Sequence, residues 1–412
     1  MDLLARRLGV PDAVVIGLGA MLGAGVFVVF APAAAAAGGA GLLPALVLAG
    51  VIAFCNATSS ARLAARYPES GGTYVYGRER LGPLAGFLAG WGFVVGKTAS
   101  CAAMALTIGA YLWPGQARLV AVGAVLAVTA VNLRGIGRTV TATKVLVGLV
   151  LAVLTLVAVA GVAGGGLSLD RLGDPGGSGR GVLTAAGLLF FAFAGYARIA
   201  TLGEEVRDPE RTIPRAVPLA LGAVLAIYLV LAVVTLGVLG ADRLASSAAP
   251  LVDVVTAAGL PGLAWVVRAG ATVAVTGVLL SLVAGVGRTT LAMARRRDLP
   301  GALAAVHPVR QVPHRAELAV ATVVILVVAL GDVRDAIGFS SCTVLVYYAI
   351  TNAAALTLGR DPGRWLPVRA LAVLGLVGCL LLAVNLPLGS VLAGFGVLAV
   401  GAAGYLLRQR SR

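Results

Sequence analysis

Two short apolar segments of the chain are suited to exposing main-chain groups where a ligand could bind them. The first, Val14 to Phe27, contains Gly17, Gly19, Gly23 and Gly25. Each glycine weakens a helix by about 1 kcal/mol relative to alanine and lets the backbone unwind without side-chain clashes. The second, Leu189 to Arg198, places four aromatic residues around a single glycine. We therefore expect both segments to interrupt a helix.

An interrupted helix inside a bilayer exposes N–H and C=O groups that a ligand, water or neighbouring protein must satisfy. The positive N-terminal end of a half-helix suits a carboxylate, and free carbonyls suit an ammonium group or a cation. An α-amino acid presents both groups. For either segment alone, close helix packing by small residues, such as Gly19 and Gly23, is the better interpretation. Because the two segments occupy corresponding positions in the chain, together they favour a binding site.

Lys97 is the most informative single residue. It lies about midway between Gly82-Pro83 and Trp113-Pro114, inside a long apolar stretch. A cation at that depth costs roughly 2.5–3.5 kcal/mol, so its side chain should face the bundle interior. All 17 acidic residues lie in loops or at the ends of apolar stretches. We expect Lys97 to bind a substrate carboxylate or to carry a coupling proton, the alternative being a lysine bonded to main-chain carbonyls.

Other polar residues near the two segments have weaker assignments. Thr276 and Ser281 are candidates for a cation site against the segment Val14 to Phe27, although hydroxyls in membrane helices usually bond their own backbone. Arg198 either pairs with an acidic residue at an inner gate or snorkels to the surface. Glu204 and Glu205 belong to a dense charged cluster there, which either exchanges ion pairs during gating or is a solvated turn.

The elements that carry these residues are membrane helices. Of 412 residues, 59% are hydrophobic and 12% are charged, with a mean hydropathy of +0.99, well above the apolar share of a soluble domain. Apolar runs of about twenty residues recur along the chain. They predict twelve spans, at residues 12–37, 41–65, 84–112, 118–134, 140–163, 182–204, 216–240, 261–294, 316–331, 334–357, 367–385 and 387–407.

The loops between these spans are short, so residues 1–412 form one membrane domain. With the N-terminus inside, the 32 basic residues divide into 24 on the inner side, five outside and three within spans. This asymmetry predicts a multi-pass protein of the cytoplasmic membrane with both termini in the cytoplasm. It also accounts for the net charge of +15 without nucleic-acid binding.

The residue types of the chain do not indicate a catalytic site or a cofactor site. The four cysteines lie in apolar runs without paired spacing, and both histidines, His307 and His314, lie in one loop. No acidic or cysteine cluster at membrane depth is placed to hold a metal or to act as acid and base. We expect neither an enzyme nor a cofactor.

Several motifs resemble, in the same order, those of the amino acid–polyamine–organocation superfamily of permeases. They are Gly19-Ala20-Met21-Leu22-Gly23-Ala24-Gly25-Val26-Phe27, Ala64-Ala65-Arg66-Tyr67-Pro68-Glu69-Ser70-Gly71-Gly72-Thr73-Tyr74-Val75-Tyr76, Gly82-Pro83-Leu84-Ala85-Gly86-Phe87-Leu88-Ala89-Gly90-Trp91, Gly203-Glu204-Glu205-Val206-Arg207-Asp208-Pro209-Glu210-Arg211-Thr212-Ile213-Pro214-Arg215-Ala216, and Arg288 leading into Met293-Ala294-Arg295 and Asp298-Leu299-Pro300. The resemblance implies an all-α, leucine-transporter-type core of 5+5 inverted repeats, at about 12–163 and 182–357, with discontinuous helices 1 and 6 and two further helices at about 367–407.

The resemblance also implies alternating access and secondary transport of amino acids, by proton-coupled symport or by exchange. By position it assigns substrate binding to Ala20, Met21, Gly23, Ala24, Gly25, Phe191, Ala192, Phe193, Gly195 and Tyr196. Lys97, Thr276 and Ser281 are then candidates for coupling, and Arg198, Glu204, Glu205 and Arg288 for a cytoplasmic gate. Proton-coupled relatives often carry a lysine on helix 5, whereas Lys144 of this chain lies near the cytoplasmic end of that span.

Three other functions are compatible with a bundle of membrane spans. A major-facilitator carrier would have a Gly-x-x-x-Asp-Arg-like turn after span 2, which this chain lacks. A solute sensor with a permease fold, and a transporter of another small amine or organic solute, remain open. Aromatic residues near Lys97, without a buried carboxylate, favour a neutral over a cationic amino acid.

Overall fold

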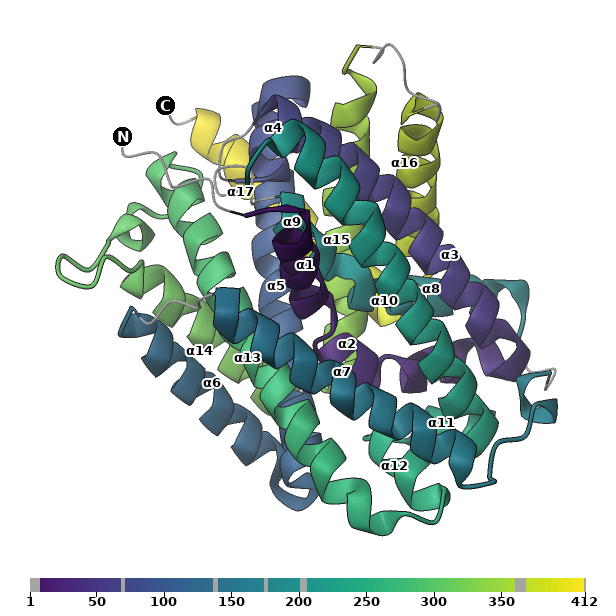
Figure 1. Cartoon of the computed structure of the whole chain (residues 1–412). Helices are drawn as coiled ribbons and strands as arrows, with labels where there is room; N and C mark the ends of the chain where they lie inside the picture. The colour runs from purple at the N-terminus through teal and green to yellow at the C-terminus, as the bar shows by residue number, and fades with distance from the viewer. Residues whose placement is uncertain are drawn as a thin grey trace.

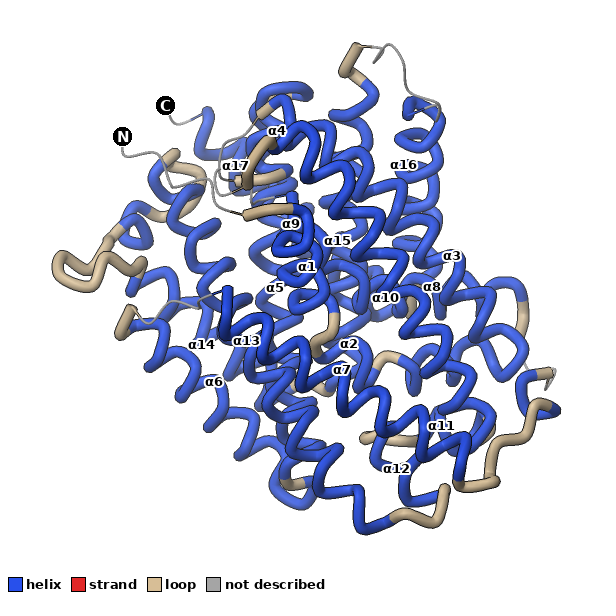
Figure 2. Tube along the Cα trace, in the orientation of Figure 1, coloured by secondary structure: helices blue, strands red, loops and turns tan. Residues whose placement is uncertain are grey.

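The computed structural model describes residues 8–67, 71–135, 140–173, 177–200, 206–359 and 368–410. Within these ranges the chain is helical apart from its loops and one isolated bridge between Leu8 and Val206 (Figure 2). Helices satisfy their own backbone hydrogen bonds, which a chain crossing lipid requires.

The first half of the described chain contains α1 (Val10–Met21), α2 (Ala24–Val28), α3 (Phe30–Arg66), α4 (Thr73–Leu81), α5 (Pro83–Leu112), η1 (Pro114–Gln116), α6 (Ala117–Leu133) and α7 (Val140–Ala163). The second half contains η2 (Asp170–Leu172), α8 (Gly179–Phe193), η3 (Ala194–Tyr196), α9 (Ala197–Ala200), α10 (Pro209–Leu239), α11 (Ala241–Ser246), α12 (Pro250–Ala257), η4 (Pro261–Leu263), α13 (Ala264–Arg295), η5 (Gly301–Ala304), α14 (His314–Leu330), α15 (Val333–Leu356), α16 (Val368–Asn385) and α17 (Leu388–Arg410).

Ten helical segments of the described chain are long and apolar enough to cross a membrane, and α1 is a shorter apolar helix. The predicted ninth span corresponds to α14, which has 17 residues. A multi-pass membrane bundle is therefore established, while the count of twelve and the inverted repeat stay predictions. The first two predicted spans are joined by a kink inside α3, where Gly38 has φ 66°. Glycine tolerates this left-handed conformation because it lacks a Cβ.

The bundle is organised around α5, which packs against α13 and α15 and also contacts α4, α6, α14 and α17. Helix α3 packs along α8 and α10, and α1 packs on α7 and α10. In Figure 1, α1 begins and α17 ends on the same side of the bundle, where α4 also lies; we call this the terminal side. Helices α11 and α12 lie toward the opposite side (Figure 1).

Candidate functional site

The first candidate segment opens the backbone. Helix α1 ends at Met21 and α2 begins at Ala24, and Leu22 (ψ 50°) and Gly23 (φ −106°, ψ −144°) between them leave helical geometry. The amide of Gly23 donates to the carbonyl of Met21 at 2.8 Å. Because the first N–H groups of a helix have no acceptor within it, the start of α2 presents donors at this point.

The second candidate segment is tightened instead of opened. Helix α8 ends at Phe193, the 3₁₀ turn η3 follows, and α9 continues from Ala197. Ala194 (φ −62°, ψ −2°) and Ala197 (φ −53°, ψ −26°) both stay in the right-handed helical region. The predicted interruption between Phe191 and Tyr196 is therefore a 3₁₀ turn and not a stretch of non-helical backbone. A 3₁₀ turn interrupts the α-helical ladder but keeps hydrogen bonds of its own.

The two interruptions lie directly against each other. A Cβ on Gly195 would fall on the carbonyl of Ala20 and within 2.8 Å of the Met21 amide nitrogen. A Cβ on Gly25 would lie 2.6 Å from the Cα of Ala192. Glycine at these two positions thus permits backbone-to-backbone contact. The structure thus brings together the two predicted sets of residues, Ala20 to Gly25 and Phe191 to Tyr196.

Three tyrosines that the sequence analysis did not select complete the site. The hydroxyl of Tyr228, on α10, lies 2.7 Å from the carbonyl of Met21 and 3.1 Å from that of Ala192, so it bridges the two interruptions. A tyrosine hydroxyl carries one proton and donates to one of these carbonyls at a time. Tyr348, on α15, donates to the carbonyl of Ala194 at 3.4 Å.

Tyr111, at the end of α5, donates to the carbonyl of Phe27 at 2.7 Å. Buried tyrosine hydroxyls usually need a partner, and inside lipid the partner must be protein. A tyrosine in the middle of an apolar span was thus a usable signal for helices α10 and α15. The rings also contact the second interruption, with the centroids of Phe193 and Tyr228 5.2 Å apart and those of Tyr196 and Tyr348 5.0 Å apart.

Lys97 lies at the middle of α5 with 7% of its surface exposed. It shares a helical face with Phe93, whose ring centroid is 5.4 Å from that of Tyr347, and with Gly90, which packs against Met293. The side chain therefore faces the bundle between α13 and α15. Among the described residues it has no hydrogen bond or ion pair, so the alternative of a carbonyl-bonded lysine is not what the structure presents.

The two hydroxyls proposed for a cation site differ in position. Val278 of α13 contacts Gly23, with its Cγ2 2.9 Å from where a Cβ would lie. Thr276 is two residues away, on nearly the opposite side of the helix from the face that contacts Gly23. Ser281 is close to the Val278 face, is exposed, and donates to the Gly277 carbonyl at 3.5 Å.

The predicted gate is only partly visible. Arg198 and Arg288 are both exposed, and Glu204 and Glu205 lie outside the described residues. A different ion pair joins α1 to α7, with the Lys144 ammonium 2.7 Å from the carboxylate of Asp12. This contact explains why Lys144 lies at the end of its span, where sequence alone gave it no partner.

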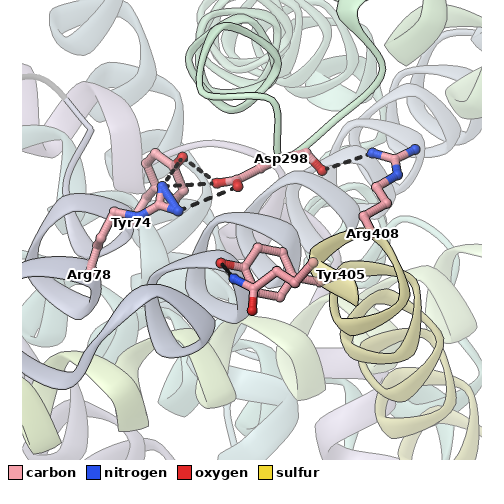
Figure 3. Close-up of polar contacts among 6 residues, drawn as sticks. Tyr74, Arg78, Asp298, Tyr405 and Arg408 are labelled. Carbon is pink, nitrogen blue, oxygen red and sulfur yellow. Dashed lines mark hydrogen bonds and ion pairs between the residues drawn. The ribbon is translucent and has the colours of Figure 1, made fainter. Parts of the chain in front are cut away.

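A second polar cluster lies on the terminal side (Figure 3). The Tyr74 hydroxyl donates to Asp298 at 2.6 Å, and Arg78 forms an ion pair with the same carboxylate at 3.2 Å. Burial raises the pKa of Tyr74 and the neighbouring Asp298 raises it further, so the phenol keeps its proton and donates. Arg408 of α17 donates to the Asp298 carbonyl at 3.3 Å from the other side. We call Tyr74, Arg78, Asp298 and Arg408 the Asp298 cluster.

An all-helical membrane bundle in which two interrupted helices meet is the architecture of a multi-pass transporter. The amino acid permease family model matches residues 12–358. The chain therefore belongs to the amino acid permease family.

Similar proteins agree with this assignment. An uncharacterized transporter of Mycobacterium tuberculosis is 62% identical over 410 residues, which covers 99% of this chain and 92% of that protein. The branched-chain amino acid permease of Bacillus subtilis is 27% identical over 442 aligned positions, covering 99% and 94%. The methylthioribose transporter of Bacillus subtilis is 28% identical over 336 residues, covering 76% and 72%. The chain is thus a transporter and not an enzyme.

Proposed function

We propose that this permease moves a neutral amino acid across the cytoplasmic membrane by alternating access, driven by protons in symport or working by exchange. The observation that carries the proposal is the direct contact between the two interruptions, bridged by Tyr228. Main-chain donors at the start of α2 suit the substrate carboxylate. Carbonyls at Met21 and Ala192 suit its ammonium, which would take over hydrogen bonds that Tyr228 now makes.

The architecture proposed for this movement is a core of two inverted repeats, at about 12–163 and 182–357, with α16 and α17 added. Interrupted lead helices at the midplane are the binding-site pattern of such repeats. The excess of basic residues on one side supports a cytoplasmic terminal side. One repeat then rocks against the other around the interruptions.

A neutral substrate is favoured by charge. The described residues of the two interruptions, Ala20 to Gly25 and Phe191 to Ala200, include no carboxylate, and Lys97 faces the interior between α13 and α15. A cationic side chain would meet a like charge without a partner. The alignment with the branched-chain amino acid permease of Bacillus subtilis covers 99% of this chain, which also favours a substrate with an apolar side chain. The vacuolar cationic amino acid transporter 2 of Arabidopsis thaliana is also 27% identical, but over 87% of this chain.

Lys97 is the proposed coupling residue. A lysine ammonium can release its proton and bind one again, so it can serve as a proton carrier. Its proton would be taken up from one side and released to the other as the access changes. Lys97 would attract the substrate carboxylate only while its amine is protonated. Movement of the substrate would therefore be linked to movement of the proton.

A second candidate function is transport of another small organic solute, because the methylthioribose transporter is as similar in sequence as the amino acid permeases. Methylthioribose carries no zwitterion, so it would not use the carboxylate and ammonium contacts. A solute sensor with the permease fold would bind substrate without moving it. Both alternatives make different predictions from the main proposal in one assay.

The test is uptake of radiolabelled leucine, isoleucine, valine, lysine and methylthioribose into proteoliposomes, with and without an inward proton gradient. We expect saturable uptake of a branched-chain amino acid, accelerated by the gradient. Uptake of methylthioribose alone would select the second candidate. Substrate binding without accumulation would indicate a sensor.

For Lys97, the variant is Lys97→Gln and the matched control is Lys144→Gln, which changes the other lysine of the chain. We expect Lys97→Gln to keep exchange of labelled for unlabelled substrate but to lose acceleration by the proton gradient, because the group that carries the proton is gone. Lys144→Gln should keep that acceleration. Wild-type pH dependence in Lys97→Gln would remove the coupling role.

A further inference from the structure

A large apolar groove runs along the outside of the bundle, away from the two interruptions. Its volume is about 940 Å³, and its floor is formed by one face of α5, including Val94, Val95 and Ala99. Helix α14 contributes one wall through Val320, Val323 and Val327, and α17 contributes the other through Ala393 and Val397.

The groove exists because its two walls do not pack on each other. Helix α14 packs on α5, α6 and α13, whereas α17 packs on α5 and α15. Trp91 fixes α17 to the floor by donating its indole N–H to the carbonyl of Val397 at 2.9 Å. In a protein surrounded by lipid, such a surface is filled by acyl chains or by another membrane helix.

The two ends of the groove differ in charge. At the terminal side it ends at Arg408 and Pro300, and at the opposite side it ends at Asp332 and Asp335. The charged side chain that lines the first end is positive and attracts an anionic headgroup, whereas the second end carries both acidic and basic side chains, because Arg118 contacts the carbonyl of Gly331 there. An arginine has five N–H donors in a planar fork suited to phosphate.

We propose that this groove binds an anionic phospholipid from the leaflet on the terminal side, with its phosphate at Arg408 and an acyl chain between α14 and α17. On the orientation proposed above this is the cytoplasmic leaflet. The site is tied to the Asp298 cluster, because Arg408 contacts the backbone of the residue that pairs with Arg78 (Figure 3). The bound lipid holds the end of α17 beside Asp298, which follows α13.

The test measures lipid retention by native mass spectrometry on the full-length, delipidated protein, with dioleoylphosphatidylglycerol or dioleoylphosphatidylcholine added back. We expect one phosphatidylglycerol to be retained about five-fold more tightly than phosphatidylcholine, the effect of one basic residue at an anionic headgroup. Arg408→Ala should abolish the preference, and Arg408→Lys should keep part of it because the charge remains.

A groove-filling variant separates chain binding from headgroup binding. Ala393→Trp places a large side chain in the groove, and Ala399→Trp places one at another exposed position of α17 that does not line it. Ala393→Trp should lose both lipids, and Ala399→Trp should behave as wild type. Equal retention of the two lipids by wild type, or a preference that survives both Arg408→Ala and Ala393→Trp, overturns the proposal. So does a wild-type dimer that Ala393→Trp dissociates irrespective of lipid, because a second copy would then cover the groove.

Discussion

The interruption in α1–α2 (helix 1) and the interruption in the helix formed by α8, η3 and α9 (helix 6) meet at one point, yet their backbones differ. In helix 1, two residues leave helical geometry, and the helix stops at Met21 and restarts at Ala24. In helix 6, the backbone stays helical and only tightens into the turn Ala194–Tyr196. The first leaves main-chain groups outside the helical hydrogen-bond pattern, where the proposed substrate would bind them, and the second supplies a close-fitting surface against the first.

Glycine has a different contact at each interruption. A side chain on Gly195 would meet the main chain of Ala20 and Met21, whereas the nearest atoms to a side chain on Gly23 belong to the side chain of Val278, namely its Cβ and its two methyl carbons. Backbone cannot move without shifting a whole helix, but a valine can change its rotamer. The single glycine of helix 6 is therefore under a stricter steric limit than the Gly23 position of the glycine-rich helix 1.

The largest effect is expected for Gly195→Ala. Its methyl group would force α1 away from η3 and misplace the main-chain groups that we propose hold the substrate. We expect initial uptake in proteoliposomes to fall by about 100-fold, equivalent to about 3 kcal/mol. Thermal unfolding of the purified protein separates loss of the site from loss of the fold.

Two alanine substitutions serve as controls for this prediction. Gly222→Ala, on α10, adds a methyl group where no atom lies within 4 Å, and should leave uptake unchanged. Gly23→Ala should be milder than Gly195→Ala and should recover when combined with Val278→Ala, which removes the clashing methyl groups. An equal loss in Gly23→Ala and Gly195→Ala, without recovery, would contradict the difference between the two interruptions.

Tyr228→Phe is expected to have the next largest effect, because this hydroxyl serves both interruptions. Its removal leaves the buried carbonyls of Met21 and Ala192 without this donor, at a cost of about 1–3 kcal/mol. We expect a lower unfolding temperature and weaker substrate binding. Saturating substrate should restore part of the stability of Tyr228→Phe if the substrate ammonium replaces the hydroxyl. An unfolding temperature of Tyr228→Phe equal to that of wild type would show that the hydrogen-bonded bridge is not formed in the membrane.

The sequence allowed the interruption between α1 and α2 to be predicted, because a high density of glycine weakens a helix directly. For helix 6 it indicated the location but not the form, since Gly195 is required by the approach of Ala20, a residue far away in the chain. The bridge by Tyr228 was missed for the same reason. The partner of a buried hydroxyl depends on how helices pack, which hydrophobic spans alone do not specify.

The predicted membrane spans were the most accurate part of the fold, because lipid imposes length and composition on each helix. The side-chain pairs were the least accurate. The sequence placed Lys144 near the end of its span but named no partner for it, and its contact with Asp12 joins residues from two different spans. Thr276 was chosen for its hydroxyl, but the register of α13 relative to Gly23 turns it away.

The smallest effect is expected for Tyr348→Phe, which tests helix 6 alone. Its hydroxyl lies 3.4 Å from the Ala194 carbonyl, a long hydrogen bond in a turn that already keeps helical geometry. The loss should be below about 1 kcal/mol, and the unfolding temperature should fall less than in Tyr228→Phe. The double variant should show additive losses, because Tyr228 contacts Met21 and Ala192 whereas Tyr348 contacts Ala194. If Tyr348→Phe instead impairs uptake as strongly as Tyr228→Phe, the turn in helix 6 must open during transport, and the difference between the two interruptions belongs to one conformation only.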